Sequence, residues 1–424
     1  MKRILLCFVF WATIMPVFAQ EQPVGDGMND DTAAIQALLD AGVNTVYLPP
    51  PPKYYLISKP LRLHSDQTLR LDPNTTVRLA DGACQYLLVN DDFENGNKNI
   101  QVIGGIWDGN NTAQTCIYHD RAKRTELFSP DKYIGCAMLF LNVKNLRVEK
   151  LTIKDSETFG IHIGNIQWFT VQDIIFDCNG KRPNMDGVHI AGNCSQGRVA
   201  NIQGNTNDDM VALNADDSEI FEISKGPITD IQIDGLFCTN GYTAVRLLSS
   251  GDPVKRIRIS NIFGSFRFNG VSFTHHSVHP GEPTVFEDII IDGVFIAKQL
   301  EKDIKPEPWS EDARRSHAIV WVASTALVEN LSIQNLSRRE WMFGAAPTIL
   351  IDETATVKNL RLRDVEQVNK SETPLRLMVN NGTIDRLFLN SVTVSKSEKE
   401  QQQQQTEIIT GKENIRETIG NILE

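Results

Sequence analysis

Short stretches of alternating apolar and polar residues recur along most of the chain. Most of them then meet Asn, Asp or Gly, which is typical of a strand with one buried face followed by a turn. The nine clearest stretches are KNLRVEKLTI (144–153), WFTVQDIIF (168–176), GRVANIQG (197–204), TDIQIDGLF (229–237), KRIRISNIF (255–263), EDIIIDGVF (287–295), ENLSIQNL (329–336), VKNLRLRDV (357–365) and IDRLFLNSV (384–392). They begin 24 to 42 residues apart, so they form an internal repeat.

A repeat of this period that contains only strands predicts an all-β fold, a single-stranded right-handed parallel β-helix whose coils stack into a solenoid. A β-sandwich or a propeller is the competing all-β arrangement. The number of units and the lack of tight two-residue hairpin turns between them argue against the sandwich.

Both ends of the repeat differ from its middle. The stretch GDGMNDDTAAIQALLDAG (25–42) has apolar residues at helical spacing and ends at Gly42, which predicts an N-terminal capping helix. A solenoid needs such a cap because an open terminal coil exposes apolar core and unpaired strand edges. We expect one elongated domain over residues 20–394, followed by a polar tail, 395–424, which carries five consecutive glutamines and lacks the repeat.

The first nineteen residues combine two early cations with an apolar run that ends at Ala19, the pattern of a signal peptide, 1–19. An N-terminal membrane anchor is the alternative, but the run is short and Pro16 interrupts it. No later stretch reaches the length of a membrane span. The mature chain is therefore expected to be secreted or periplasmic, without a membrane span.

Charge and cysteine content narrow the class of partner. The net charge of −11 becomes −13 without Lys2 and Arg3, and an acidic surface does not attract nucleic acid or anionic membranes. We expect a monomer with no nucleic-acid partner, no metal and no cofactor. Disulfides and buried free thiols remain equally open for the six cysteines that follow residue 19, which show no Cys-x-x-Cys spacing: Cys84, Cys116, Cys136, Cys178, Cys194 and Cys238.

The stretch from 184 to 214 carries the candidate chemistry. It holds Asn184-x-Asp186 and, twenty-two residues after Asp186, the adjacent pair Asp208 and Asp209. If one coil takes about that many residues, Asp186 and Asp208 lie on neighbouring strands roughly 4.8 Å apart. Like charges that close resist joint ionisation, which keeps one carboxyl protonated as an acid while others act as bases. Turn residues at coil corners are the alternative interpretation.

These motifs resemble a known family. The stretch 25–42 resembles the opening of the pectate-lyase-like β-helix superfamily, and SETFGIHIGN, NMDGVHI and NDDMVALN resemble three successive coils of glycoside hydrolase family 28, the polygalacturonases and their relatives. The resemblance implies an inverting hydrolysis. In it Asp208 would be the general acid, Asp186 and Asp209 would hold and deprotonate the attacking water, and Asn184 would orient that site.

The chain differs from the family at two substrate-binding motifs. The usual Gly-His-Gly reads Gly241-Tyr242-Thr243, and the usual Arg-x-Lys is replaced by Ser272 and Thr274. Recognition of a uronate carboxylate in the family's usual way is therefore not expected.

Four other side chains are candidates for substrate binding. Arg246 lies one coil from the carboxylates and offers a bidentate fork to an acidic sugar, or else an ion pair to a site aspartate. Tyr242 offers a ring for stacking on a sugar, with core packing as the alternative. His162 and His189 lie in alternating strands and line the same face, unless they are satisfied wall residues.

Three functions stay open. The first is an inverting hydrolase of O-glycosidic bonds in a pectin-like or other complex polysaccharide or oligosaccharide. The second is a non-catalytic glycan-binding β-helix, consistent with the altered substrate grip. The third is a polysaccharide lyase, which abstracts the proton next to a uronate carboxyl and often uses Ca²⁺.

Overall fold

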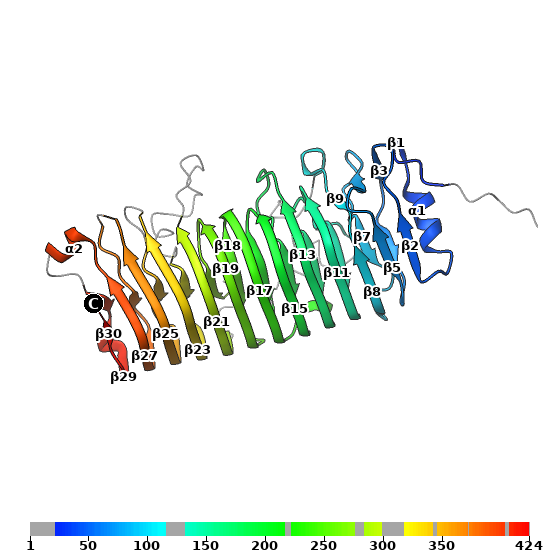
Figure 1. Cartoon of the computed structure of the whole chain (residues 1–424). Coiled ribbons are helices and arrows are strands. Elements are labelled where there is room, and N and C mark those ends of the chain that lie inside the picture. The colour runs from blue at the N-terminus through cyan, green and yellow to red at the C-terminus, as the bar shows by residue number, and fades with distance from the viewer. Residues whose placement is uncertain are drawn as a thin grey trace, which may run out of the picture.

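The computed structural model describes residues 22–115, 132–216, 222–275, 284–298, 318–341, 346–371, 373–402 and 407–423. Its strands wind into one elongated solenoid in which every recorded strand pairing is parallel (Figure 1). The predicted parallel β-helix is thus confirmed. The predicted signal peptide, 1–19, and Cys116 lie outside the described residues.

Two sheets run the length of the solenoid. The first has twelve strands. They are β4 (Leu61–Leu63), β7 (Leu88–Asn90), β10 (Met138–Leu141), β12 (Ile161–Gly164), β14 (Val188–Ala191), β16 (Asp209–Asn214), β18 (Thr243–Leu248), β20 (Val271–Thr274), β22 (Val320–Val322), β24 (Ile349–Ile351), β26 (Met378–Asn380) and β28 (Ile409–Thr410).

The second sheet has eighteen strands and holds the long ones. They are β1 (Asp26–Asp30), β2 (Thr45–Leu48), β3 (Tyr54–Ile57), β5 (Thr68–Leu71), β6 (Thr76–Leu79), β8 (Asn97–Ile103), β9 (Ile106–Asp108), β11 (Val143–Lys154), β13 (Gln167–Asp177), β15 (Cys194–Asn205), β17 (Ile228–Gly241), β19 (Val254–Phe266), β21 (Thr284–Lys298), β23 (Ala326–Glu340), β25 (Thr356–Asn369), β27 (Thr383–Ser395), β29 (Ile415–Ile419) and β30 (Ile422–Leu423).

The repeated stretches of the sequence form the long strands β11 to β27. The turn expected within each unit is a one-residue bend rather than a loop. In three successive coils the bend falls at Gly235, Asn261 and Gly293, with φ of 78°, 59° and 82°. Gly, Asn and Asp enter this left-handed region most readily, which explains why they occupy the aligned position in seven of the nine units; Lys150 and Ser391 occupy it in the first and the last.

The core of the solenoid is built from columns of identical or similar side chains. One column runs through Val199, Ile233, Ile259, Ile291 and Ile333, each aligned with the next across neighbouring strands. All five are fully buried. Burying one such side chain contributes about 1.5–3 kcal/mol, so each coil is stabilised mainly by the coils on either side of it.

The N-terminal coil is covered by α1 (Thr32–Leu39), as the sequence predicts (Figure 1). Ile35 and Leu39 are buried against the first coils. The amide of Gln67 donates to the carbonyl of Leu39 at 2.8 Å and so satisfies one of the carbonyls left open at the helix end.

The described part of the expected C-terminal tail continues the solenoid. After α2 (Glu398–Gln402), β28 pairs with β26, and β29 and β30 pair with β27. Ile408 and Ile409 are buried at 8% and 4% exposure. A few apolar residues are enough to add one more coil here, because β26 and β27 already supply a complementary edge.

The described part of the chain also contains three short 3₁₀ helices. They are η1 (Asn111–Ala113), η4 (Glu222–Ser224) and η6 (Lys412–Asn414). Within the described residues, we find no helix with both the length and the apolar character needed to cross a bilayer.

Candidate active site

Three acidic side chains converge where β14 and β16 begin. Asp186 lies two residues before β14, Asp208 lies just before β16, and Asp209 is the first residue of β16. One carboxylate oxygen from each lies within 4.8 Å of the others. Asp186 and Asp209 are buried, at 5% and 3% exposure, whereas Asp208 is partly exposed. The structure therefore brings together the three carboxylates that the sequence singled out.

The pairing of these carboxylates differs from the expected one. Val188 is aligned with Val211, so the coil here takes 23 residues rather than 22. The backbone N–H of Gly187 donates to the carbonyl of Asp209 at 2.9 Å. Asp209 rather than Asp208 is thus the neighbour of Asp186 across the strands, and Asp208 lies one residue earlier.

Asp208 is held from both sides of its carboxylate. The amide of Asn184 donates to its Oδ2 at 3.4 Å, and the backbone N–H of Asp209 donates to its Oδ1 at 3.0 Å. Asn184 has a left-handed φ of 57°, which asparagine tolerates better than most residues. This backbone conformation belongs to the turn from which Asn184 reaches the neighbouring coil.

Asp186 is bonded to a buried histidine. Nδ1 of His189 lies 2.7 Å from Asp186 Oδ2. The His189 ring stacks on Phe159 with a centroid distance of 3.9 Å and on His162 at 4.8 Å. His162 and His189 are 0% and 1% exposed, so neither ring offers a surface to a glycan as the side chains stand. Burial, together with the neighbouring His189, holds the pKa of His162 well below its usual value.

Arg246 lies on the next coil from the carboxylates, in β18, aligned with Ala212 and Ser272. Its Nη1 is 3.9 Å from Asp209 Oδ2, and its Nε donates to Thr274 Oγ1 at 3.0 Å. The side chain is 31% exposed. Arg246 therefore pairs with a site carboxylate and still presents part of its surface to solvent; its contact with an acidic sugar stays a prediction.

Tyr242 precedes Thr243, which is aligned with Asp209. Its ring stacks on Phe268 at 4.0 Å, and the Arg267 guanidinium lies 5.8 Å from its centre. Arg267 also donates to Asn207, the residue before Asp208, at 3.0 Å. Tyr242 is thus part of a packed wall next to the carboxylates, and stacking on a sugar stays a prediction.

Two further aromatic residues, Trp168 and Phe273, lie away from the site. Trp168 is 46% exposed on β13 of the eighteen-stranded sheet, where the Lys144 ammonium lies 4.8 Å from its ring centre. Phe273 is fully buried in the core. Neither side chain contacts the three carboxylates.

A buried ion pair near the site was not anticipated from the sequence. Glu157 is fully buried, and Arg182 Nε lies 3.2 Å from its Oε1. Burial raises the pKa of Glu157 to about 7, although Arg182 opposes the shift. Arg182 also donates to the carbonyls of Asn111 and Gln114, at 2.8 and 3.0 Å, so it ties the turn before Asn184 to earlier coils. The available signal was the acidic residue in SETFGIHIGN.

Glu157→Gln should flatten the dependence of stability on pH. The folded pKa of about 7 lies above the ordinary 4.5, so the unfolded chain loses this proton at lower pH than the folded chain. The contribution of Glu157 is complete below about pH 4.5 and is lost as pH rises through about 7. At 1.36 kcal/mol per pKa unit, the wild type should lose about 3 kcal/mol more than the variant over this range. Denaturant unfolding of both proteins at several pH values measures this; parallel pH profiles would contradict it.

The three carboxylates are also the donor set that a hard cation such as Ca²⁺ prefers. Exposed acidic groups are common without a metal, so a cluster of carboxylates does not by itself assign one. The cysteines that the structure describes are free thiols: Cys84, Cys136, Cys178, Cys194 and Cys238. Burial raises the pKa of both Cys178 and Cys194 to about 12, which makes these thiols poor nucleophiles and poor metal ligands.

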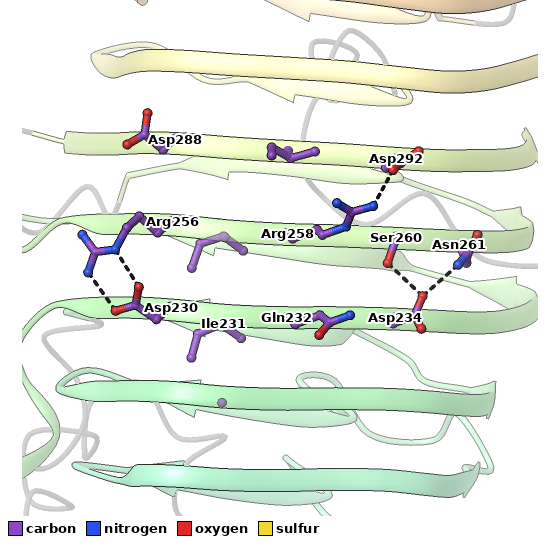
Figure 2. Close-up of a pocket in the computed structure, with 13 residues that line it drawn as sticks. Asp230, Ile231, Gln232, Asp234, Arg256, Arg258, Ser260, Asn261, Asp288 and Asp292 are labelled. Atoms are coloured by element: carbon purple, nitrogen blue, oxygen red, sulfur yellow. Dashed lines mark hydrogen bonds and ion pairs between the residues drawn. The ribbon is translucent and has the colours of Figure 1, made fainter.

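A hollow of about 910 Å³ lies elsewhere, on the outer face of the eighteen-stranded sheet across β17, β19 and β21 (Figure 2). Both of its arginines pair with aspartates, and its other two aspartates, Asp234 and Asp288, accept hydrogen bonds from neutral side chains. Arg256 makes a two-pronged contact with Asp230 at 2.6 and 2.7 Å, and Arg258 lies 2.7 Å from Asp292 (Figure 2). Because these charges already have partners, the carboxylates at β14 and β16 are the better candidate for an active site.

Comparison with known proteins agrees with that choice. The sequence model of glycosyl hydrolases family 28 matches residues 52–262, a segment that contains all three carboxylates. The chain belongs to glycosyl hydrolases family 28. It is 27% identical over 289 residues to a polygalacturonase of Persea americana, an alignment that covers 64% of this chain and 60% of that protein. The chain thus spans less than two thirds of the length of this relative.

Solved structures show the same fold as this family 28 chain at low sequence identity. A family 28 exopolygalacturonase of Yersinia enterocolitica superposes with a TM-score of 0.53 and 14% identity, covering 94% of this chain and 76% of that one. The surface protein and adhesin PfbA of Streptococcus pneumoniae gives 0.56 and 13%, covering 94% and 98%. An enzyme and an adhesin share the architecture, so function has to be argued from the site.

Proposed function

We propose that this chain is a glycoside hydrolase that cleaves O-glycosidic bonds in a pectin-like or other complex polysaccharide or oligosaccharide, with inversion. The convergence of Asp186, Asp208 and Asp209 within 4.8 Å carries the proposal. Family membership and the polygalacturonase relatives support the same chemistry and the same class of substrate.

The proposed roles follow from how each carboxylate is placed. Asp208 is the partly exposed member, so it can reach the glycosidic oxygen of a bound glycan and protonate it. Asp186 and Asp209 are buried side by side on neighbouring coils and would hold and deprotonate the attacking water. Three carboxylates this close resist joint ionisation, which favours one protonated acid beside two ionised bases.

The spacing of the carboxyls bears on stereochemistry. Inverting glycosidases usually separate acid and base by about 6.5–9.5 Å and retaining ones by about 5–5.5 Å. The 4.8 Å limit concerns one oxygen from each carboxyl group and does not measure the separation of the carboxyl carbons. Inversion is therefore proposed from the family motifs and from the presence of two bases that can share one water, not from the spacing alone.

Arg246 is the proposed substrate-binding residue. Ser272 and Thr274 replace the family's usual cations, and Arg246 is partly exposed one coil from Asp209. A guanidinium at this place would bind the carboxylate of an acidic sugar beside Asp209. Arg246→Gln is expected to raise KM for an acidic glycan about tenfold or more with a smaller change in kcat. Steady-state kinetics on an acidic and a neutral glycan measures this; equal effects on both would contradict it.

The test of the function is digestion of a panel of plant and microbial glycans, with NMR analysis of the products. Release of new reducing ends supports hydrolysis. Unsaturated products that absorb in the ultraviolet, together with loss of activity in chelator, would indicate a lyase. Binding without any bond cleavage across the panel would indicate a glycan-binding protein.

We also propose that the chain is exported, because residues 1–19 have the pattern of a signal peptide. N-terminal sequencing of the protein made by its native host should begin at Gln20. A mature protein that begins at Met1 would contradict export by this route.

The expected monomer can be checked by light scattering on the same sample.

A further inference from the structure

Asp186 and His189 form a short hydrogen bond between two buried side chains in the site. The Nδ1–Oδ2 distance is 2.7 Å, compared with 3.4 and 3.0 Å for the two hydrogen bonds that Asp208 accepts from Asn184 and from the Asp209 N–H. Both side chains are buried, at 5% and 1% exposure. A short bond between buried polar groups fixes the orientation of both, since breaking it would leave them without water to replace it.

The chemistry of the partners decides the direction of this bond. An ionised carboxylate only accepts hydrogen bonds, so Nδ1 of His189 carries the hydrogen and donates it to Asp186. On the other side of the ring, the Asn214 amide nitrogen lies 3.5 Å from Nε2. This arrangement suits the tautomer with hydrogen on Nδ1 and a lone pair on Nε2.

The His189 ring is itself held in place by stacking. Phe159 lies on one side at 3.9 Å with an interplanar angle of 23°, and His162 lies at 4.8 Å with 14°. Stacked rings of this kind add about 0.5–1.5 kcal/mol beyond burial and restrict rotation of the ring. The ring therefore presents Nδ1 to Asp186 in one fixed direction.

We propose that His189 is a positioning residue for hydrolysis, which holds Asp186 Oδ2 so that the other carboxylate oxygen faces the attacking water. The proposal rests on the proposed function and deepens it. His189 does not contact the glycan; it acts through Asp186. Its value to the reaction is orientation, since an error of about 1 Å in a catalytic group costs roughly 100-fold in rate.

Two variants of His189 separate the hydrogen bond from the stacking. His189→Phe keeps a stacked ring but has no donor, whereas His189→Asn loses the ring and places an amide N–H near the position of Nδ1. The proposal expects roughly 100-fold lower kcat in His189→Phe, with KM changed less than about threefold. His189→Asn should recover at least about tenfold of that loss. Equal kcat values in wild type and His189→Phe would overturn the proposal.

A spectroscopic readout is independent of turnover. Protein labelled with ¹⁵N-histidine should show, for the signal missing in His189→Phe, hydrogen on Nδ1 and none on Nε2. That signal should change in Asp186→Asn, which alters the acceptor. A His189 with hydrogen on Nε2 alone would overturn the proposal even if the enzyme is active. A wild-type chain that cleaves no glycan, by contrast, overturns the proposed function.

Discussion

Asp208→Asn is expected to lower kcat by about 1,000-fold or more on any glycan that the wild type hydrolyses. An amide cannot donate a proton to the leaving oxygen, and general acid catalysis contributes about 10²–10⁴-fold. Asn184 and the Asp209 N–H donate to different oxygens of the carboxylate, and the single amide oxygen of the isosteric asparagine can still accept one of these two hydrogen bonds. KM should therefore change little. Initial-rate measurements on the purified variant check this; turnover within threefold of wild type would remove Asp208 from the mechanism.

A matched control changes charge by the same amount away from the site. Asp230→Asn removes a carboxylate on the outer face of the eighteen-stranded sheet, where it pairs with Arg256. Exposed pairs of this kind contribute about 0–1 kcal/mol to stability. The control should keep wild-type kcat and unfold at nearly the same temperature, so that a loss seen only in Asp208→Asn is a loss of chemistry.

Gly187→Ala is expected to damage both stability and catalysis. A Cβ at this position would lie 2.4 Å from the carbonyl oxygen of Met210 and 2.8 Å from the Phe176 ring. Gly187 follows Asp186, and its N–H bonds to Asp209, so relief of the clash has to move β14 away from β16. Overpacking of this kind costs about 1–3 kcal/mol. Displacing Asp186 from Asp209 by about 1 Å should cost roughly 100-fold in kcat.

Gly382→Ala is the matched control for that variant. Its Cβ would meet two backbone carbonyls, Ala355 O at 2.5 Å and Asp352 O at 2.6 Å, just before β27 near the C-terminal end of the solenoid. We expect a similar fall in the free energy of unfolding but an unchanged kcat. Thermal unfolding and initial rates compare the two; an equal loss of kcat in both variants would mean that strand spacing at Asp186 is not what matters.

The architecture could be predicted from the sequence because the alternation of apolar and polar residues repeats from unit to unit. Alternation in units such as TDIQIDGLF reports which side chains enter the core, and the Gly or Asn after it reports the left-handed bend. Each coil repeats these constraints, so an irregular pattern in a single unit does not change the fold that the other units predict. The coil added by β28 to β30 was missed since it carries only short apolar segments among polar residues.

The sequence predicted only which carboxylates form the candidate site, not their detailed arrangement. Spacing along the chain brought Asp186, Asp208 and Asp209 to one place, but a one-residue difference in coil length set which of them are neighbours. The bond from His189 to Asp186 depends on side-chain orientation, which the strand pattern does not encode. The raised pKa of Glu157 likewise depends on burial beneath a later turn, and no local sequence feature reports that depth.

The configuration of the first product tests the central account most directly. Proton NMR during the first turnovers reports the anomer released before mutarotation mixes the two forms. Two bases that share one water opposite the acid Asp208 predict that the new reducing end has the anomeric configuration opposite to that of the bond cleaved. A first product that retains the configuration would contradict this arrangement and would make one of the three carboxylates a nucleophile.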